Sequence, residues 1–210
     1  NMTLHDLYLL SPELSMVIIA SVVIALDLLL KDKKILPVVA LIGLLVPIFF
    51  GIRLWAIDDE YAFFDTFRLD SFALFFKYLV IGATALVILS STKYVEKFKY
   101  HQGEYYALIL FSATGMMLLA SSVEFITIYV ALELTALPIA ALAAFLRESR
   151  SAESGMKFLV LSAVSSAILL YGMVLIYGYT GTSHLSEIAI QISKMGIDSS
   201  PALIFGIVLI

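Results

Sequence analysis

Long apolar runs, separated by short polar segments, dominate the pattern of the chain. An α-helix rises about 1.5 Å per residue, so about 20 apolar residues cross a hydrocarbon core of roughly 30 Å. The pattern predicts six complete spanning helices: Leu14–Leu30, Ile35–Ile57, Phe72–Ser91, Tyr105–Ser121, Phe125–Phe145 and Met156–Tyr179. A seventh run begins near Pro201 and reaches Ile210, about half the length needed. We therefore expect the chain to be part of a longer protein.

Composition agrees with this pattern. The 210 residues are 61% hydrophobic and only 14% charged, whereas about 25% of residues in soluble proteins are charged. A fold this apolar must bury its surface in lipid or against other helices. The net charge of −4 argues against a nucleic-acid partner, which requires a basic face. The predicted fold class is an all-α, polytopic transmembrane helix bundle in a lipid bilayer.

The charged loops predict an orientation. Basic residues follow the first, third and fifth spans: Lys31, Lys33, Lys34, Lys93, Lys97, Lys99, Arg147 and Arg150. The alternate loops are mainly acidic. The positive-inside rule places the basic loops in the cytoplasm and the N-terminus outside. The first residues lack the basic leader and cleavage site of a signal peptide, so we expect the first span to be retained.

Redox chemistry is not expected in this chain. It contains no cysteine, which excludes disulfides, thiolate zinc sites and iron–sulfur clusters on its own residues. Its three histidines, His5, His101 and His184, fall in polar connecting segments and not inside the spans, where axial ligands of a membrane haem would lie. We therefore predict no bound cofactor and no metal site.

A polar stretch, Thr92–Glu104, divides the chain. The spans before it are mostly bulky and apolar, and those after it contain more small and hydroxyl residues, which let membrane helices approach closely. We predict two parts: residues 1–100 with three leading helices, and residues 101–210 with a packed functional bundle.

Glu133 is the strongest candidate for chemistry. It lies roughly 12 Å into the fifth span, where a charged carboxylate costs about 2.5–3.5 kcal/mol or more. Tyr129 shares its face, and Pro138 frees the carbonyl of Leu134. A carboxyl group beside such an opening can hold and release a proton. The alternative is a protonated glutamate that makes one interhelical hydrogen bond.

Lys157, at the inner end of the sixth span, is the second candidate. A lysine there either takes part in proton transfer or extends to the cytoplasmic interface. Counted from the shared inner loop, Glu133 lies around 10 Å deeper, so we expect no direct salt bridge between the two side chains.

Three other charges have simpler interpretations. Asp27 precedes Lys31 by four residues, which predicts an ordinary helix-surface pair. Lys77 lies one to two turns into the third span and is expected to be an interfacial anchor. Glu124 opens the fifth span, where the helix N-terminus favours an acid.

Two segments resemble a known family. Residues 129–145 read YVALELTALPIAALAAF, and residues 152–172 read AESGMKFLVLSAVSSAILLYG. The pair resembles the fifth and sixth helices of the antiporter-like membrane subunits of proton-pumping NADH:quinone oxidoreductase, respiratory complex I, and the N subunit best. The resemblance implies about fourteen helices, with two inverted five-helix repeats after the first three. Residues 101–210 would then be the first part of the proton-translocating repeat, from the fourth helix to the start of the seventh. The lysine of the family's broken seventh helix would then fall just beyond Ile210.

The resemblance also implies a function. Glu133 and Lys157 match the family's proton-translocating glutamate and lysine, with Pro138 as a helix break next to the site. It implies an enzyme only as a subunit, in a bacterial cell membrane, with other membrane subunits as partners and with NADH, flavin, iron–sulfur clusters and quinone bound elsewhere in the complex. Two alternatives stay open: a subunit of a multi-part Na⁺/H⁺ antiporter or membrane-bound hydrogenase, and a non-pumping membrane scaffold.

Overall fold

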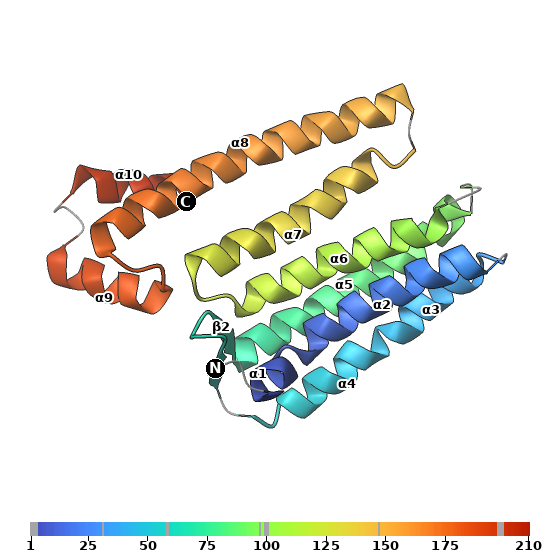
Figure 1. The fold of residues 1–210 in the computed structure, drawn as a ribbon, viewed down its shortest axis with the longest axis horizontal. Coiled ribbons are helices and arrows are strands. Elements are labelled where there is room, and N and C mark those ends of the chain that lie inside the picture. Colours follow the sequence, from blue (N-terminus) through green and yellow to red (C-terminus); the bar gives the residue numbers. More distant parts are fainter. Residues whose placement is uncertain are drawn as a thin grey trace.

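The apolar runs fold into long helices that lie side by side (Figure 1). The structure is a computed structural model, and it describes residues 4–30, 32–57, 59–96, 98, 101–146, 148–196 and 200–210. Six helical segments of this part of the chain are long and apolar enough to cross a membrane. They are α2 (Ser11–Leu29), α3 with α4 (Ile35–Gly43 and Leu45–Leu54), α5 (Ser71–Val95), α6 (Gln102–Ser121), α7 (Phe125–Ala143) and α8 (Ser149–Thr180). The predicted all-α bundle with six spans is confirmed.

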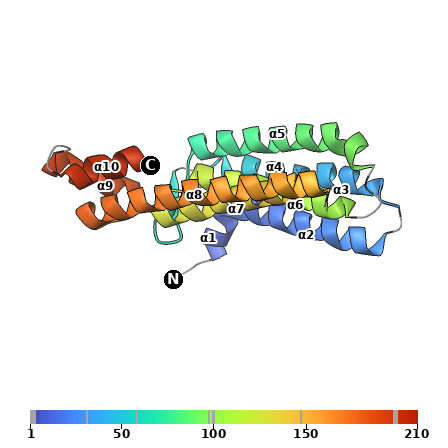
Figure 2. The ribbon, with the colours of Figure 1, turned by 90° about the horizontal axis from the view of Figure 1, so that it is seen from above.

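The helices pack in an order that follows the chain. Helix α6 is central and contacts α2, α5 and α7, while α7 in turn contacts α8. Seen from above (Figure 2), α6, α7 and α8 lie in one layer, with α5 on one side of it and α2 on the other. Helix α7 is therefore held between α6 and α8, and its two faces meet different neighbours.

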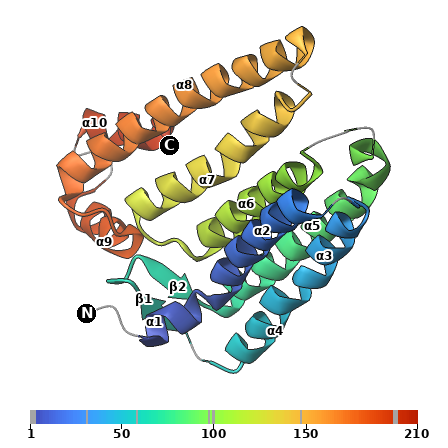
Figure 3. The same ribbon diagram turned by 45° about the vertical axis from the view of Figure 1, so that its right-hand side comes forward.

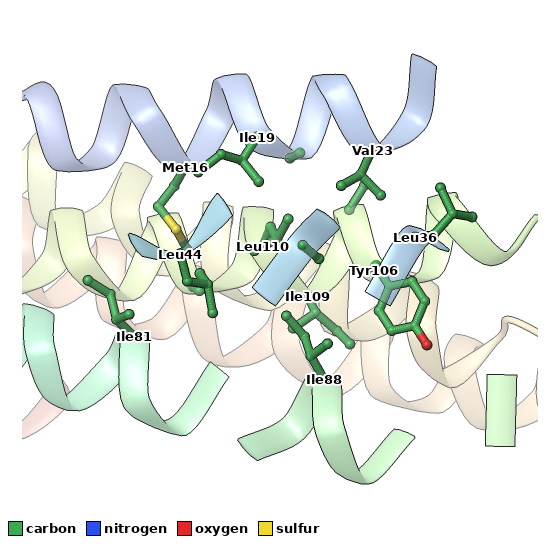
Figure 4. Packing of buried hydrophobic residues seen from close by; sticks show 14 of the residues in the cluster. Met16, Ile19, Val23, Leu36, Leu44, Ile81, Ile88, Tyr106, Ile109 and Leu110 are labelled. Carbon is green, nitrogen blue, oxygen red and sulfur yellow. The ribbon is translucent and has the colours of Figure 1, made fainter. Parts of the chain in front are cut away.

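The main core lies between α2, α3, α5 and α6. Its buried side chains include Met16 and Val23 of α2, Ile88 of α5, and Tyr106 and Leu110 of α6 (Figure 4). Small residues let α6 approach its neighbours closely. A Cβ atom on Gly103 would lie 2.3 Å from the Cβ of Asp27 on α2, so only glycine allows this approach.

The second predicted span is interrupted in its middle. Helix α3 ends at Gly43 and α4 begins at Leu45, with a turn at Leu44. Pro47 explains the interruption, because it has no N–H group to donate to the carbonyl of Gly43. The two short helices still form a single segment of spanning length.

The sixth span begins earlier than predicted. Helix α8 starts at Ser149, seven residues before Met156, and runs for 32 residues. No proline interrupts these polar residues, and Glu153 and Lys157 form an i,i+4 pair that supports the helix. An apolar run predicts only the apolar part of a helix, so polar residues at the start of a helix are not predicted by it.

Short elements that the apolar pattern did not predict gather at one end of the bundle. They are α1 (Leu4–Leu9), the antiparallel hairpin of β1 (Glu60–Ala62) and β2 (Phe67–Leu69), and the amphipathic helix α9 (Leu185–Met195). We call this end, at which α2, α5 and α7 begin, the hairpin end. The final helix α10 (Pro201–Leu209) returns along α8 (Figure 1).

Backbone hydrogen bonds join the hairpin to the α6–α7 turn and to the segment before α9. The N–H of Val123 donates to the carbonyl of Thr66 at 3.1 Å, and the N–H of Leu185 donates to the carbonyl of Val123 at 3.1 Å. Single β-bridges join Phe67 to Ser122 and Glu124 to His184. The start of α7 is therefore fixed from both sides, as Figure 3 lets the reader follow.

Two of the simpler interpretations of charges need revision. Lys77 is not an interfacial anchor: it is 2% exposed and its Nζ lies 2.7 Å from Oε1 of Glu13 on α2. Asp27 is buried and pairs with Lys33, at 2.8 Å; Lys31, the partner predicted for it, lies outside the described residues. In both cases the partner comes from a neighbouring element or loop, which helix spacing alone does not reveal.

Candidate functional site

Glu133 lies on the face of α7 that meets α8. Its side chain is half-buried and lines a hollow of about 280 Å³ between the two helices. Within α7, the hollow is lined by residues that recur at helical spacing on one face: Tyr129, Glu133, Ala136, Leu137 and Ala140. The carboxyl group therefore lies in the interior of a spanning helix and next to an open space.

Helix α8 provides hydroxyl groups opposite this carboxyl group. Ser162 and Ser166, one turn apart, line the same hollow together with Ala163 and Ala167. A serine hydroxyl can donate one hydrogen bond and accept others, so it can serve either the charged or the protonated form of a carboxyl group. In the described part of the chain, Glu133 makes no ion pair and no protein hydrogen bond. Among the described residues, its carboxyl oxygens therefore face the hollow without a protein partner.

The opposite face of α7 rests on α6. Ser112 of α6 is 4% exposed, and its hydroxyl donates to the carbonyl of Thr135 at 3.1 Å. Gly115, one turn along α6, lies so close to α7 that a Cβ atom there would be 2.6 Å from the Thr135 nitrogen and 2.9 Å from the carbonyl carbon of Leu134. The backbone of α7 next to Glu133 is thus in direct contact with α6.

Pro138 does not break α7. The helix runs without interruption from Phe125 to Ala143 with Pro138 inside it, so the expected helix break next to the site is absent. The proline removes only the hydrogen bond that its own nitrogen would have donated to Leu134. Helix α7 tolerates the loss of this hydrogen bond because α6 packs against the same turn.

The structure does not bring Lys157 to the hollow. Its side chain is 71% exposed in this chain, and its Nζ lies 2.5 Å from Oε1 of Glu153, one turn earlier on α8. As predicted, Lys157 and Glu133 form no direct salt bridge in the described part of the chain. Lys157 remains a candidate from sequence alone.

Glu124 caps the helix that carries the site. Its carboxylate accepts hydrogen bonds from the backbone N–H of Thr127 at 2.9 Å and from the hydroxyl of Thr127 at 3.1 Å. Burial acts to raise the pKa of Glu124, but the hydrogen bonds from Ser183 and Thr127 outweigh it, and the pKa is lowered overall. The acid predicted at this helix start is confirmed as an N-cap.

From the sequence, Ser112, Gly115, Ser162 and Ser166 were predicted only to be small residues that allow close packing of helices. Two spacings in the sequence indicate that these residues share helix faces. Ser162 and Ser166 are four residues apart and so share one face of α8. Ser112 and Gly115 are three apart and share one face of α6. Neither spacing identifies which helix the face meets, so the pairing needed the structure.

The chain resembles known membrane proteins along most of its length. Residues 122–210 match a family described as NADH:quinone oxidoreductase/Mrp antiporter, TM. Over 209 residues the chain is 41% identical to NADH-quinone oxidoreductase subunit N of Dehalococcoides mccartyi, which covers 97% of this chain and 43% of that protein. Over 207 residues it is 35% identical to the subunit N of Trichlorobacter lovleyi, covering 97% and 42%. The chain thus spans less than half the length of these relatives.

Solved structures share the fold. Respiratory complex I from Thermus thermophilus contains a chain that superposes with a TM-score of 0.72 at 23% identity, over 94% of this chain and 42% of that one. The membrane-bound sulfane sulfur reductase, an archaeal respiratory membrane complex, contains one with a TM-score of 0.73 at 22% identity, over 97% and 43%. Both agree with the first part of an antiporter-like fold.

Proposed function

Because the chain belongs to the NADH:quinone oxidoreductase/Mrp antiporter family of membrane proteins, we propose that it is part of subunit N of a proton-translocating NADH:quinone oxidoreductase. In this proposal Glu133 takes up and releases protons as quinone is reduced elsewhere in the complex. Lys157 is a second proton-transferring group, reached through water or other side chains. The chain itself carries out no redox chemistry, and NADH, flavin, iron–sulfur clusters and quinone are bound by other subunits.

One observation carries the proposal: the carboxyl group of Glu133 borders a hollow in the interior of α7, opposite the hydroxyls of Ser162 and Ser166. A glutamate inside a spanning helix is costly and is therefore a functional candidate by default. A purely structural glutamate would be expected to use its oxygens in fixed hydrogen bonds. In the described part of the chain Glu133 makes none with protein groups, which favours a group that exchanges protons.

Orientation and partners follow from the same proposal. The hairpin end faces the outside and the basic loops face the cytoplasm, as the positive-inside rule favours. Proton exchange at Glu133 then connects a site roughly 12 Å from the hairpin end of α7 to further groups in the complex. Other membrane subunits pack against the exposed apolar faces, and lipid covers the rest.

The test uses the whole complex in sealed membrane vesicles. Proton translocation is measured with a pH-sensitive dye while NADH-dependent quinone reduction is recorded, for Glu133→Gln, Glu133→Ala and the control Glu148→Gln. Glu148 is an exposed glutamate in the described part of the loop before α8. We expect the number of protons translocated per quinone to fall several-fold in both Glu133 variants and to stay unchanged in the control. An unchanged ratio in both Glu133 variants, with the complex assembled, would favour the non-pumping scaffold.

A second candidate is a subunit of a multi-part Na⁺/H⁺ antiporter. The family description includes the Mrp antiporter, and the fold also occurs in a different respiratory complex, so the fold does not separate the two. The same vesicles distinguish them. A NADH-independent exchange of Na⁺ for protons that is lost in Glu133→Gln supports the antiporter, whereas its absence alongside NADH-driven pumping supports the oxidoreductase.

A further inference from the structure

Helix α7 lacks one internal hydrogen bond next to the candidate site. Pro138 leaves the carbonyl of Leu134 without its helical hydrogen-bond donor, one residue beyond Glu133. A helix that lacks an internal hydrogen bond bends more readily at that turn. The direction in which Glu133 points then depends on what supports α7 there.

Part of that support comes from Ser112 and Gly115 on α6. The hydroxyl of Ser112 donates to the carbonyl of Thr135, at 3.1 Å, within the turn that Pro138 weakens. Gly115 brings α6 into contact with the Leu134–Thr135 peptide, where a Cβ atom would lie 2.6 Å from the Thr135 nitrogen. Both α6 residues are buried. One hydrogen bond and one close backbone contact thus join this turn directly to α6.

The contact lies opposite the hollow. Successive residues of an α-helix are turned by about 100°, so Thr135 lies about 200° around α7 from Glu133. A shift of the α7 backbone at Thr135, on the α6 side, would therefore change the distance from Glu133 to Ser162 and Ser166 on the α8 side.

We propose that Ser112 and Gly115 form a seat on α6 that positions Glu133 against the hydroxyls of α8. They are positioning residues, because neither lines the hollow. The inference rests on the proposed function for its effect on pumping, but not for its effect on the carboxyl group itself. Among the residues that line the hollow, Tyr129 is the other titratable group, and it lies on the same helix face as Glu133.

Matched controls are available in the same chain. Thr114 of α6 is 4% exposed like Ser112, but its hydroxyl donates to the carbonyl of Leu110 in its own helix, at 2.8 Å. Gly82 of α5 is a helical glycine like Gly115, but a Cβ atom there would meet nothing within 4 Å. Ser112→Ala is therefore compared with Thr114→Val, and Gly115→Ala with Gly82→Ala.

Two measurements on the intact complex in vesicles test the seat. The first is the pH-dependent infrared band of the Glu133 carboxyl group, identified by its loss in Glu133→Gln. The second is the pH profile of protons translocated per quinone reduced. We expect Ser112→Ala and Gly115→Ala to shift the frequency and titration midpoint of the band and to lower pumping several-fold. Ser112→Thr keeps a hydroxyl group and should therefore retain part of the pumping and show a smaller band shift than Ser112→Ala. The controls Thr114→Val and Gly82→Ala should match the unmodified complex in both measurements.

The outcomes separate this inference from the proposed function. If Glu133→Gln leaves pumping unchanged while Ser112→Ala still shifts the infrared band, the seat exists and the proposed function fails. If Glu133→Gln abolishes pumping but Ser112→Ala and Gly115→Ala give the same band and pH profile as their controls, the seat is overturned.

Discussion

Nζ of Lys77 on α5 lies 2.7 Å from Oε1 of Glu13 on α2, and the two side chains are 2% and 3% exposed. The ring of Phe67 on β2 covers the ammonium group, with 4.8 Å between Nζ and the ring centroid. The carboxylate oxygens and the ammonium make no well-formed hydrogen bond in the described part of the chain. The pair is therefore held by its own attraction and by the contact with the Phe67 ring, close to the hairpin end.

Removing one member of this pair should destabilise the protein strongly. Lys77→Met or Glu13→Leu alone leaves an uncompensated buried charge, which typically costs about 3–5 kcal/mol. The double variant replaces a weakly hydrogen-bonded pair by apolar side chains, and such exchanges are often neutral or stabilising. We expect thermal unfolding in detergent to show a much lower unfolding temperature for each single variant and a nearly unchanged one for the double variant.

The exposed pair of His5 and Glu60, at 2.7 Å, is the control. Exposed pairs contribute about 0–1 kcal/mol, so Glu60→Gln should leave the unfolding temperature nearly unchanged. If the double variant loses as much stability as the two single variants added together, the two charges do not interact.

The Glu124 cap should make the start of α7 sensitive to acid. The pKa of Glu124 is lower in the folded protein than its ordinary value, because hydrogen bonds from Ser183 and Thr127 outweigh the effect of burial. A lowered folded-state pKa adds stability above the ordinary pKa, and this stability is lost as the pH falls through the folded-state value. The protection of residues 124–128 against hydrogen exchange, measured relative to the intrinsic exchange rate at each pH, should therefore decrease below about pH 4.5.

Glu124→Gln should remove this acid dependence and accelerate exchange already at neutral pH, since losing an N-cap costs about 1 kcal/mol. Asp70 provides a comparison, because its side chain accepts a hydrogen bond from the N–H of Ala73 at the start of α5, at 2.7 Å. Asp70→Asn should affect exchange at the start of α5 and leave residues 124–128 as they were. Protection of residues 124–128 that does not change in acid in the unmodified protein would contradict the role of the cap.

Gly103 should tolerate no side chain. A Cβ atom at this position would lie 2.3 Å from the Cβ of Asp27 and 3.0 Å from the carbonyl oxygen of Val23. Gly103→Ala must therefore separate α6 from α2 and disturb the ion pair of Asp27 with Lys33. We expect a loss of about 1–3 kcal/mol by overpacking, measured by thermal unfolding. A stabilised Gly103→Ala variant, as helix propensity alone would give, would contradict the packing.

The sequence predicted the parts of the fold that are set by lipid. Apolar runs located all six spans, because the bilayer requires about 20 apolar residues in each, and the resemblance identified the family. The helix start at Ser149 and the hairpin were not predicted, since their residues form no long apolar run. The turn at Leu44 was also missed, although Pro47 was visible as its cause.

The candidate site was predictable only in part. Glu133 stood out because a carboxyl group inside a span is costly, but the serines that face it became recognisable only when α7 and α8 were placed together. For Lys77 the prediction from the sequence was wrong. A lysine near a helix end normally extends to the interface, and only the structure revealed that Glu13, 64 positions earlier in the sequence, meets it in the interior.

Lys157 offers the clearest separation of function from stability. Its side chain is 71% exposed in this chain and pairs with Glu153 on the same helix, so Lys157→Met should change stability by only about 0.2–0.5 kcal/mol. If Lys157 transfers protons in the complex, Lys157→Met should lower the protons translocated per quinone, and Glu153→Gln, which removes only the helix pair, should not. Lys157→Arg keeps the charge but releases a proton far less readily, so it should also impair pumping. Equal pumping in all three variants and the unmodified complex would leave Glu133 as the single candidate among the described residues.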